Sequence, residues 1–190
     1  MVDVAYSKEK SLDKTVERMP EDYGDRQTPL CTKTMPVTLI LDNLRSAFNT
    51  GNIFRVADAV RLDRIIGCGY TPLPPHEKLH KTARGCENTV TTEHSPDAAT
   101  AVSKCRREGY TTYAVETGEN AQTVWNVALD FPAAFVCGNE ALGISADGLE
   151  KCDYIINIPC MGYKHSINVG NCVAVTVYES LRQWRLYDRI

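Results

Sequence analysis

The sequence has no long apolar run, no CxxC pair and no excess of positive charge. A membrane-spanning helix needs about 20 consecutive apolar residues, and no stretch of the chain reaches that length. The N-terminal MVDVAYSKEKSLDK is charged where a signal peptide needs an apolar segment, which predicts a cytoplasmic protein. The formal net charge is −3 at pH 7, so a nucleic acid would have to be held by a local basic patch.

The eight cysteines also lack the spacing of a zinc site or of a disulfide framework. Three of them, Cys68, Cys137 and Cys172, fall inside expected strands or helices, where a free cysteine behaves as a small hydrophobic residue. Disulfides are also rare in cytosolic proteins. We therefore expect reduced and mostly buried thiols, and no metal site.

Strand-like and helix-like segments alternate along the chain. Apolar runs of strand length lie at 37–42, 64–69, 110–116 and 155–159, and another begins at Phe135. Most of them are followed by a segment with apolar residues at helical spacing. This alternation predicts an α/β fold with a mostly parallel sheet flanked by helices.

The length of 190 residues suits one domain. We expect that domain over residues 36–190, preceded by a polar extension over residues 1–35. Within the extension, only residues 8–18 show a weak helical pattern. A further short strand is expected over residues 89–92.

Helix boundaries are indicated by capping residues. Asn49 is expected to cap the helix after the first strand, and Ser95 the helix that ends before Gly109. A final helix should begin near Val169. Its apolar stripe continues over residues 184–187, further than one small domain needs, which indicates a subunit interface.

Three polar loops follow strands, namely NTGNIFR at 49–55, GNEALG at 138–143 and GYKHSIN at 162–168. In open α/β sheets, ligands bind beyond the carboxyl ends of the strands, where these loops would meet. A dinucleotide site would need glycines directly after the first strand. The first glycine there is Gly51, which disfavours a nicotinamide enzyme.

Each loop taken alone also has a purely structural explanation. The glycines of GNEALG can serve only to turn the chain, and Arg55 can be a solvated cation on its helix. Ser166 and Asn168 can cap the last helix. The cationic cluster between His76 and Arg84 can be no more than a solvated face. The order and spacing of the loops carry more information than any one of them.

Together the loops form three ordered motifs. These are N-x-G-x-x-x-R with Asn49, Gly51 and Arg55, then G-x-E-x-x-G with Gly138, Glu140 and Gly143, and finally a stretch with Ile158, Pro159, Gly162, Ser166, Ile167, Asn168 and Val169. With them, residues 37–185 resemble the SPOUT class of methyltransferases, in its SpoU/TrmH branch of RNA ribose 2′-O-methyltransferases. The chain departs from the usual pattern in having Cys160 between the proline and Met161, and Ile167 in place of leucine.

The resemblance implies a SPOUT fold with a deep trefoil knot in the C-terminal third, and S-adenosylmethionine as the cofactor. We also expect a homodimer, and the apolar stripe of the C-terminal helix indicates that it forms through that helix. The cofactor-binding residues would be Gly138, Gly143, Ile158, Met161 and Ile167. The catalytic residues would be Arg55, Asn49, Glu140, Ser166 and Asn168. The RNA-binding cations would be Arg45, Lys78, Lys81, Arg84 and Lys164.

The leading hypothesis is therefore an S-adenosylmethionine-dependent enzyme that methylates a ribose 2′-hydroxyl in tRNA or rRNA. A guanidinium is a reluctant base, so Arg55 is expected to orient a phosphate and stabilise the developing alkoxide, held in place by Asn49 and Glu140. One alternative is a non-catalytic RNA-binding module that retains the fold. Another is a metabolic nucleotide-binding enzyme, which the missing dinucleotide fingerprint disfavours.

Overall fold

The computed structural model describes residue 29 and residues 31–184. Contacts within the chain divide it into Met1–Leu30 and Cys31–Ile190, and every element named below belongs to the second unit. The helix expected over residues 8–18 lies outside the described residues. In the described part of the chain, no helix is both long and apolar enough to cross a membrane.

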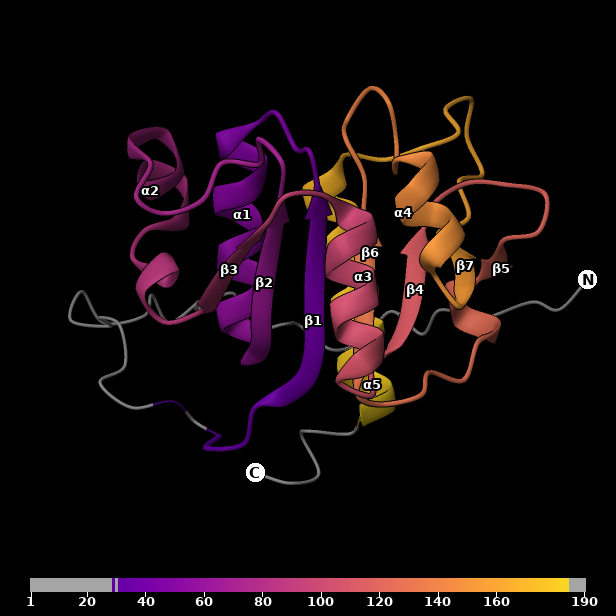
Figure 1. The fold of residues 1–190 in the computed structure, drawn as a ribbon, viewed down its shortest axis with the longest axis horizontal. Coiled ribbons are helices and arrows are strands. Elements are labelled where there is room, and N and C mark those ends of the chain that lie inside the picture. The colour runs from indigo at the N-terminus through magenta and orange to yellow at the C-terminus, as the bar shows by residue number, and fades with distance from the viewer. Residues whose placement is uncertain (1–28, 30, 185–190) are drawn as a thin grey trace, which may run out of the picture. The chain divides into compact units, whose positions relative to one another are not determined.

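A seven-stranded sheet forms the centre of this unit, and all of its strand pairs are parallel. The strand order is β3-β2-β1-β6-β4-β7-β5 (Figure 1). The strands are β1 (Met35–Asp42), β2 (Leu62–Cys68), β3 (Thr91–Ser95), β4 (Thr111–Val115), β5 (Gln122–Thr123), β6 (Ala133–Cys137) and β7 (Tyr154–Asn157). The predicted parallel α/β fold is thereby confirmed.

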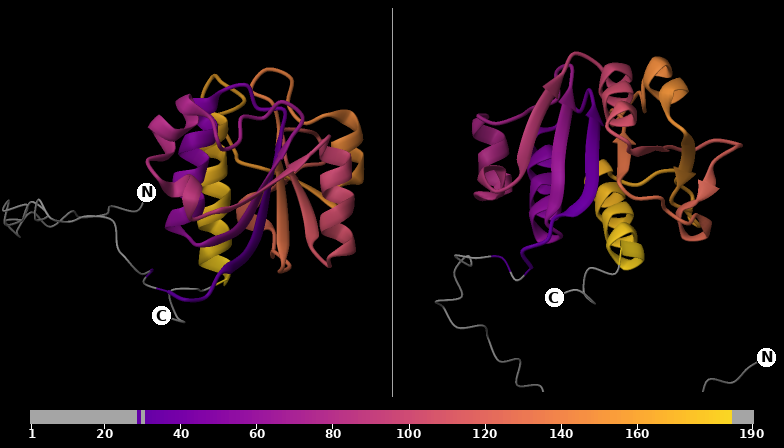
Figure 2. Two further views of the ribbon diagram at one scale, coloured as in Figure 1. Left: turned by 60° about the vertical axis from the view of Figure 1, so that its left-hand side comes forward. Right: turned by 60° about the horizontal axis from the view of Figure 1, so that its bottom comes forward.

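Helices cover both faces of the sheet, as Figure 2 shows in its left view. The helices are α1 (Ala47–Ala59), α2 (Glu77–Ala83), α3 (Ala98–Arg107), α4 (Ala146–Lys151) and α5 (Val169–Trp184), with short 3₁₀ turns at Cys86–Asn88 and Val124–Asn126. Helices α1, α2 and α5 supply residues to one hydrophobic cluster. Helices α3 and α4 supply residues to another, on the opposite face.

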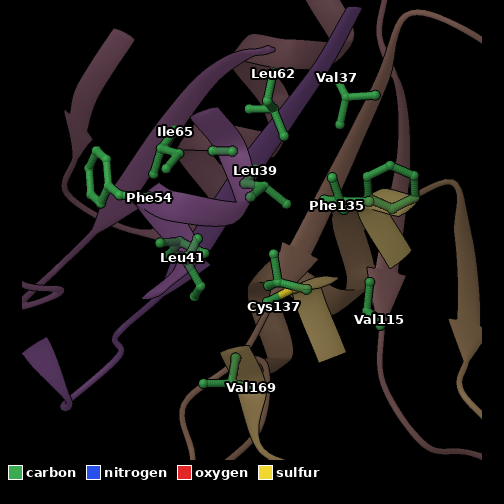
Figure 3. Close-up of a cluster of buried hydrophobic side chains, with 14 of the residues drawn as sticks. Val37, Leu39, Leu41, Phe54, Leu62, Ile65, Val115, Phe135, Cys137 and Val169 are labelled. Atoms are coloured by element: carbon green, nitrogen blue, oxygen red, sulfur yellow. The ribbon is translucent and has the colours of Figure 1, made fainter. Parts of the chain in front are cut away.

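The alternation of side chains along β1 explains the two clusters. Val37, Leu39 and Leu41 point to the face covered by α1 and α5, where Figure 3 shows them with Phe54 of α1. Ile40 points to the opposite face and belongs to the cluster under α3. A strand that is buried on both faces must be apolar at nearly every position, which is why residues 37–41 are apolar except for Thr38.

Two of the expected helix caps were wrong. Ser46, not Asn49, caps α1, because its hydroxyl accepts a hydrogen bond from the Asn49 amide at 3.2 Å. Asp97, not Ser95, caps α3, because its carboxylate accepts from the Thr100 amide at 2.7 Å. Ser95 is instead the last residue of β3, which runs over 91–95 rather than 89–92.

Two short elements were not predicted from the sequence. Helix α2 buries only Leu79 and Ala83, so its periodic signal covers a single turn. Strand β5 has two residues, fewer than any hydrophobic pattern can reveal, and it extends the sheet beyond β7. The expected final helix is confirmed from Val169, but Trp184 at its end packs on Phe131 of the same chain, with ring centroids 5.3 Å apart.

All eight cysteines are free and none is exposed, as expected for structural thiols. Burial raises the pKa of Cys68 and of Cys152 to about 12, so both stay protonated at neutral pH. The trefoil knot remains a prediction, because strand order and pairing alone do not define how a loop is threaded.

The core can be tested by a pair of identical substitutions. Leu39 is fully buried in β1, whereas the side chain of Leu142 is 83% exposed. Leu39→Ala should lower the free energy of unfolding by about 2–5 kcal/mol, because it leaves a cavity between β1 and its covering helices. Leu142→Ala should change it by less than about 0.5 kcal/mol. Equal losses in chemical denaturation would contradict this description of the core.

Candidate active site

The strands β1 and β6 are neighbours at the centre of the sheet, where its winding reverses. From β1 the chain builds β2 and β3 to one side, and then crosses by α3 to build the other side beginning with β4. Such a reversal leaves a crevice at the carboxyl ends of the central strands, which is where open α/β sheets bind ligands. The loops at 43–46 after β1 and at 138–145 after β6 border this crevice.

The carboxylate of Glu140 joins these two loops. Its Oε2 accepts a hydrogen bond from the Arg45 amide at 3.0 Å. Its Oε1 accepts from the Ser46 amide at 3.1 Å and from Asn49 Nδ2 at 2.9 Å. Two of these donors are backbone amides at the start of α1, where the helix dipole also favours a negative charge.

These bonds fix the ionisation of Glu140. Partial burial acts to raise the pKa of its carboxyl, but the hydrogen bonds from the Arg45 amide, from Asn49 and from the Ser46 amide outweigh that effect. The pKa therefore lies below the usual value for glutamate, and the group is a carboxylate at neutral pH.

Asn49 brings the third motif to the same place. Its Oδ1 accepts a hydrogen bond from Asn168 Nδ2 at 3.2 Å, while its Nδ2 donates to Glu140. Asn168 Oδ1 accepts in turn from the Gly170 amide at 2.9 Å, in the first turn of α5. The motif residues Asn49, Glu140 and Asn168, which are far apart in the sequence, thus form one hydrogen-bonded chain between three loops.

A hollow of about 410 Å³ opens beside this chain of hydrogen bonds, lined by Arg45, Ser46, Asn49 and Glu140. The Arg45 side chain is exposed at its rim. The Arg45 and Ser46 amides are already bonded to Glu140, so the exposed Arg45 side chain is the cation that this hollow offers to a ligand.

Three polar residues hold the loop after β6, and the sequence reasoning missed two of them, Asp42 and Glu116. Asp42, which is 1% exposed, accepts from the Ser145 amide at 2.8 Å. Glu116 accepts from the Ile144 amide at 3.2 Å. Asn139 Oδ1 accepts from the amides of Ala141 and Leu142. The sequence signal that could have identified them is a carboxylate or amide side chain directly at the end of a strand. Asp42 and Glu116 both occupy such a position.

The glycines of this loop are required by close backbone approach. A Cβ on Gly138 would lie 2.2 Å from the backbone carbon of Gly143. Gly143 has φ +71°, and a Cβ there would lie 2.6 Å from a Glu116 carboxylate oxygen. Gly51 in the first motif serves packing instead, because a Cβ there would lie 2.7 Å from the Thr82 side chain on α2.

The loop after β7 is open to solvent. Residues 161–168 are all exposed, including Met161 at 90% and Ile167 at 41%. Ile158 at its start packs against the hydrophobic cluster under α5. Among the residues that the structure describes, no backbone hydrogen bond within or to residues 159–167 is found. The amides and carbonyls of this loop are therefore available to a ligand.

Among the described residues, the remaining predicted catalytic and RNA-binding residues make no hydrogen bond to the chain formed by Glu140, Asn49 and Asn168. Ser166 and Lys164 are exposed in the loop after β7. Arg55 is exposed, and within the described part of the chain it makes no hydrogen bond or ion pair. It lies six residues beyond Asn49, about 9 Å further along α1 and about 120° around the axis. Lys78, Lys81 and Arg84 form a separate exposed group on and just after α2.

Known proteins resemble this chain in sequence. The sequence model of the SpoU rRNA methylase family matches residues 36–178. A Staphylococcus haemolyticus protein assigned to the TrmH family of tRNA/rRNA methyltransferases is 29% identical over 168 residues, which cover 86% of this chain and 67% of that protein. The chain thus spans about two thirds of the length of this relative, and 59% of a similar one from Staphylococcus saprophyticus.

Solved structures have the same fold. The SpoU methyltransferase AviRb from Streptomyces viridochromogenes, solved with AdoMet, matches with a TM-score of 0.71 and 24% identity over 81% of this chain and 62% of that one. An RNA 2′-O ribose methyltransferase matches with a TM-score of 0.71 and 25% identity over 89% of this chain and 63% of that one. Since the family model covers nearly all of the sheet and most of α5, the chain belongs to the SpoU rRNA methylase family.

Proposed function

We propose that this protein transfers a methyl group from S-adenosylmethionine to a ribose 2′-hydroxyl in tRNA or rRNA. The observation that carries the proposal is the hydrogen-bonded chain from Glu140 through Asn49 to Asn168, which brings the three family motifs to one edge of the sheet. Membership of the family and the likeness to a ribose methyltransferase support it.

The residues present fit S-adenosylmethionine. Gly138 and Gly143 keep side chains away from a tightly folded loop, and the open backbone of residues 159–167 offers donors and acceptors for an adenosine. The half-buried Ile158 supplies an apolar contact for a base. When bound there, S-adenosylmethionine supplies an electrophilic methyl group.

We assign Glu140 a positioning role. A general base needs a lone pair directed at the substrate hydroxyl and a pKa near the working pH. The Glu140 carboxylate already accepts three hydrogen bonds and its pKa is lowered. It therefore fixes the start of α1 against the loop after β6, and it does not take the proton.

Arg55 is the motif residue that we assign to act on the substrate. Its guanidinium is exposed and is not bound to Asn49 or Glu140, contrary to the role first expected for those two residues. A guanidinium carries its charge at any working pH. Preorganised positive charge stabilises a developing alkoxide and also orients a phosphate, and these are the two roles we assign to Arg55.

RNA would be held by the exposed cations near this edge. Arg45 lines the hollow and Lys164 lies in the loop after β7. Lys78 and Lys81 stand three residues apart on α2, and so share one face of that helix. Contacts of these side chains to phosphates would compensate for the net negative charge of the whole chain.

Methyl transfer tests the proposal directly. Labelled S-adenosylmethionine should label total tRNA or rRNA at an alkali-resistant dinucleotide step, which is the signature of a methylated ribose. Arg55→Ala should lower the rate by about 10²–10³-fold, the usual effect of removing one preorganised transition-state donor. Arg107→Ala, which removes an exposed arginine from α3 on the other face of the sheet, should leave it unchanged.

Two outcomes would contradict the assignment. Label in an alkali-labile position would mean that the modified atom is not the 2′-oxygen. Equal rates for Arg55→Ala and the wild type would remove Arg55 from the reaction. Binding of RNA without any methyl transfer to either RNA pool would favour the non-catalytic RNA-binding module.

We also propose that the protein is a homodimer that assembles through α5. The Tyr178 side chain on this helix is 52% exposed and Val175 beside it is only half-buried. Tyr178→Asp should shift the sedimenting species from the mass of two chains to that of one. Tyr154→Asp, at the start of β7, should keep the wild-type mass. A wild-type protein that sediments as a monomer at micromolar concentration would contradict the dimer.

A further inference from the structure

Tyr70 is an aromatic side chain whose position the core does not explain. It follows β2 at the carboxyl edge of the sheet, and it is 59% exposed. Burial of a ring normally accounts for a tyrosine in a folded domain. Here most of the ring faces solvent at the edge that carries the candidate active site.

The backbone on both sides of Tyr70 is fixed. The Gly69 amide donates to the Ser95 carbonyl at 3.0 Å, and the Thr71 amide donates to the Cys68 carbonyl at 3.1 Å. The buried hydroxyl of Thr71 donates to the Leu41 carbonyl at 2.9 Å. The same hydroxyl accepts from the amide of residue 44 at 3.0 Å. The turn after β2 is thereby tied to the loop after β1.

The far end of the Tyr70 ring is fixed as well. Its hydroxyl accepts a hydrogen bond from Asn139 Nδ2 at 2.9 Å, and Asn139 is 6% exposed. The same Nδ2 donates to the Asn43 carbonyl at 2.6 Å. An exposed ring that is held at both ends has lost its rotational freedom before any ligand arrives, which removes most of the entropic cost of a contact.

The surroundings of the ring indicate its ligand. The ring hydroxyl is bonded to Asn139, which directly precedes Glu140. The Tyr70 amide donates to Asn43 Oδ1 at 3.4 Å, two residues before Arg45, so Tyr70 is tied to both loops whose residues line the hollow. The exposed Lys78 follows only eight residues later, on α2. An exposed aromatic face that is already immobilised is the kind of surface on which unpaired RNA bases stack.

We propose that Tyr70 is a stacking platform for an unpaired base of the RNA, next to the nucleotide that enters the hollow. The substrate class is therefore a single-stranded loop or end rather than a continuous duplex. This inference rests on the proposed RNA-modifying function, but it concerns recognition and not the methyl-transfer step.

Two substitutions separate stacking from a purely structural role of the hydroxyl. Tyr70→Phe keeps the ring and removes the bond to Asn139, whereas Tyr70→Ala removes both. If the ring stacks on a base, Tyr70→Ala should weaken binding of a fluorescein-labelled 12-nucleotide oligouridylate about 5- to 150-fold. Tyr70→Phe should weaken it by less than about threefold. Tyr154→Ala serves as the matched control, because Tyr154 lies at the amino end of β7 and not at the carboxyl edge of the sheet. This variant should bind the oligouridylate as the wild type does.

Further measurements identify the contact. The affinity for S-adenosylmethionine, measured by calorimetry, should be unchanged in Tyr70→Ala, which shows that the loops remain in place. An oligouridylate that carries 5-iodouridine should photo-crosslink to Tyr70 in the wild type. A 12-base-pair RNA duplex should bind no more weakly to Tyr70→Ala than to the wild type.

The proposal would be overturned if Tyr70→Phe lost as much affinity as Tyr70→Ala, since the hydroxyl alone would then matter. It would also be overturned if Tyr70→Ala bound the oligouridylate as well as the wild type. These binding results do not require catalysis. Absence of methyl transfer with the stacking pattern intact would therefore reject the proposed function and leave the base platform in place.

Discussion

The candidate site depends on one carboxylate. Glu140 accepts hydrogen bonds from the amides of Arg45 and Ser46 and from the Asn49 side chain, and so it ties the loop after β6 to the start of α1. Without it, two amides at the beginning of a helix would lose their acceptor. Asn49 in turn accepts a hydrogen bond from Asn168. This bond fixes the end of the long exposed loop after β7.

The other polar groups at this edge support that arrangement. Asp42 and Glu116 accept from amides of the loop after β6, and the buried Asn139 closes that loop on itself. The result is a rigid half of the site beside a loop with free backbone groups. Rigidly held side chains can position a substrate. The unbonded backbone groups of the loop after β7 remain available to bind the cofactor. Arg55 and Tyr70 then stand as exposed side chains at separate points, one assigned to the reaction and one to recognition.

Much of this was predictable from the sequence, because strand-length apolar runs followed by polar loops define a parallel sheet and one functional edge. The spacing of the motifs also placed Asn49, Glu140 and Asn168 at that edge. The sequence did not reveal which hydrogen bonds these residues make. The bond between Asn49 and Glu140 joins residues 91 positions apart and therefore depends on tertiary packing. The caps failed for a local reason, since at both helix starts another residue with a capping oxygen lay within three positions.

Gly51 and Tyr70 show two further limits of sequence reasoning. Gly51 belongs to the first motif, yet its lack of a side chain is needed because α2 packs against α1 at this position. Helix α2 itself gave almost no sequence signal, because it buries only a single turn. Tyr70 lies outside every motif, and only its exposure and its bond to Asn139 distinguish it from an ordinary loop residue.

We infer that Glu140 and Asn49 act as one unit that holds the site together. A double-mutant cycle with Asn49→Ala and Glu140→Gln tests it most directly, with the affinity for S-adenosylmethionine at pH 7 as the readout. The double variant should lose less affinity than the sum of the two single losses, with a coupling energy of about 0.5–3 kcal/mol. Losses that add to within about 0.5 kcal/mol would show that the two residues act independently and would contradict it.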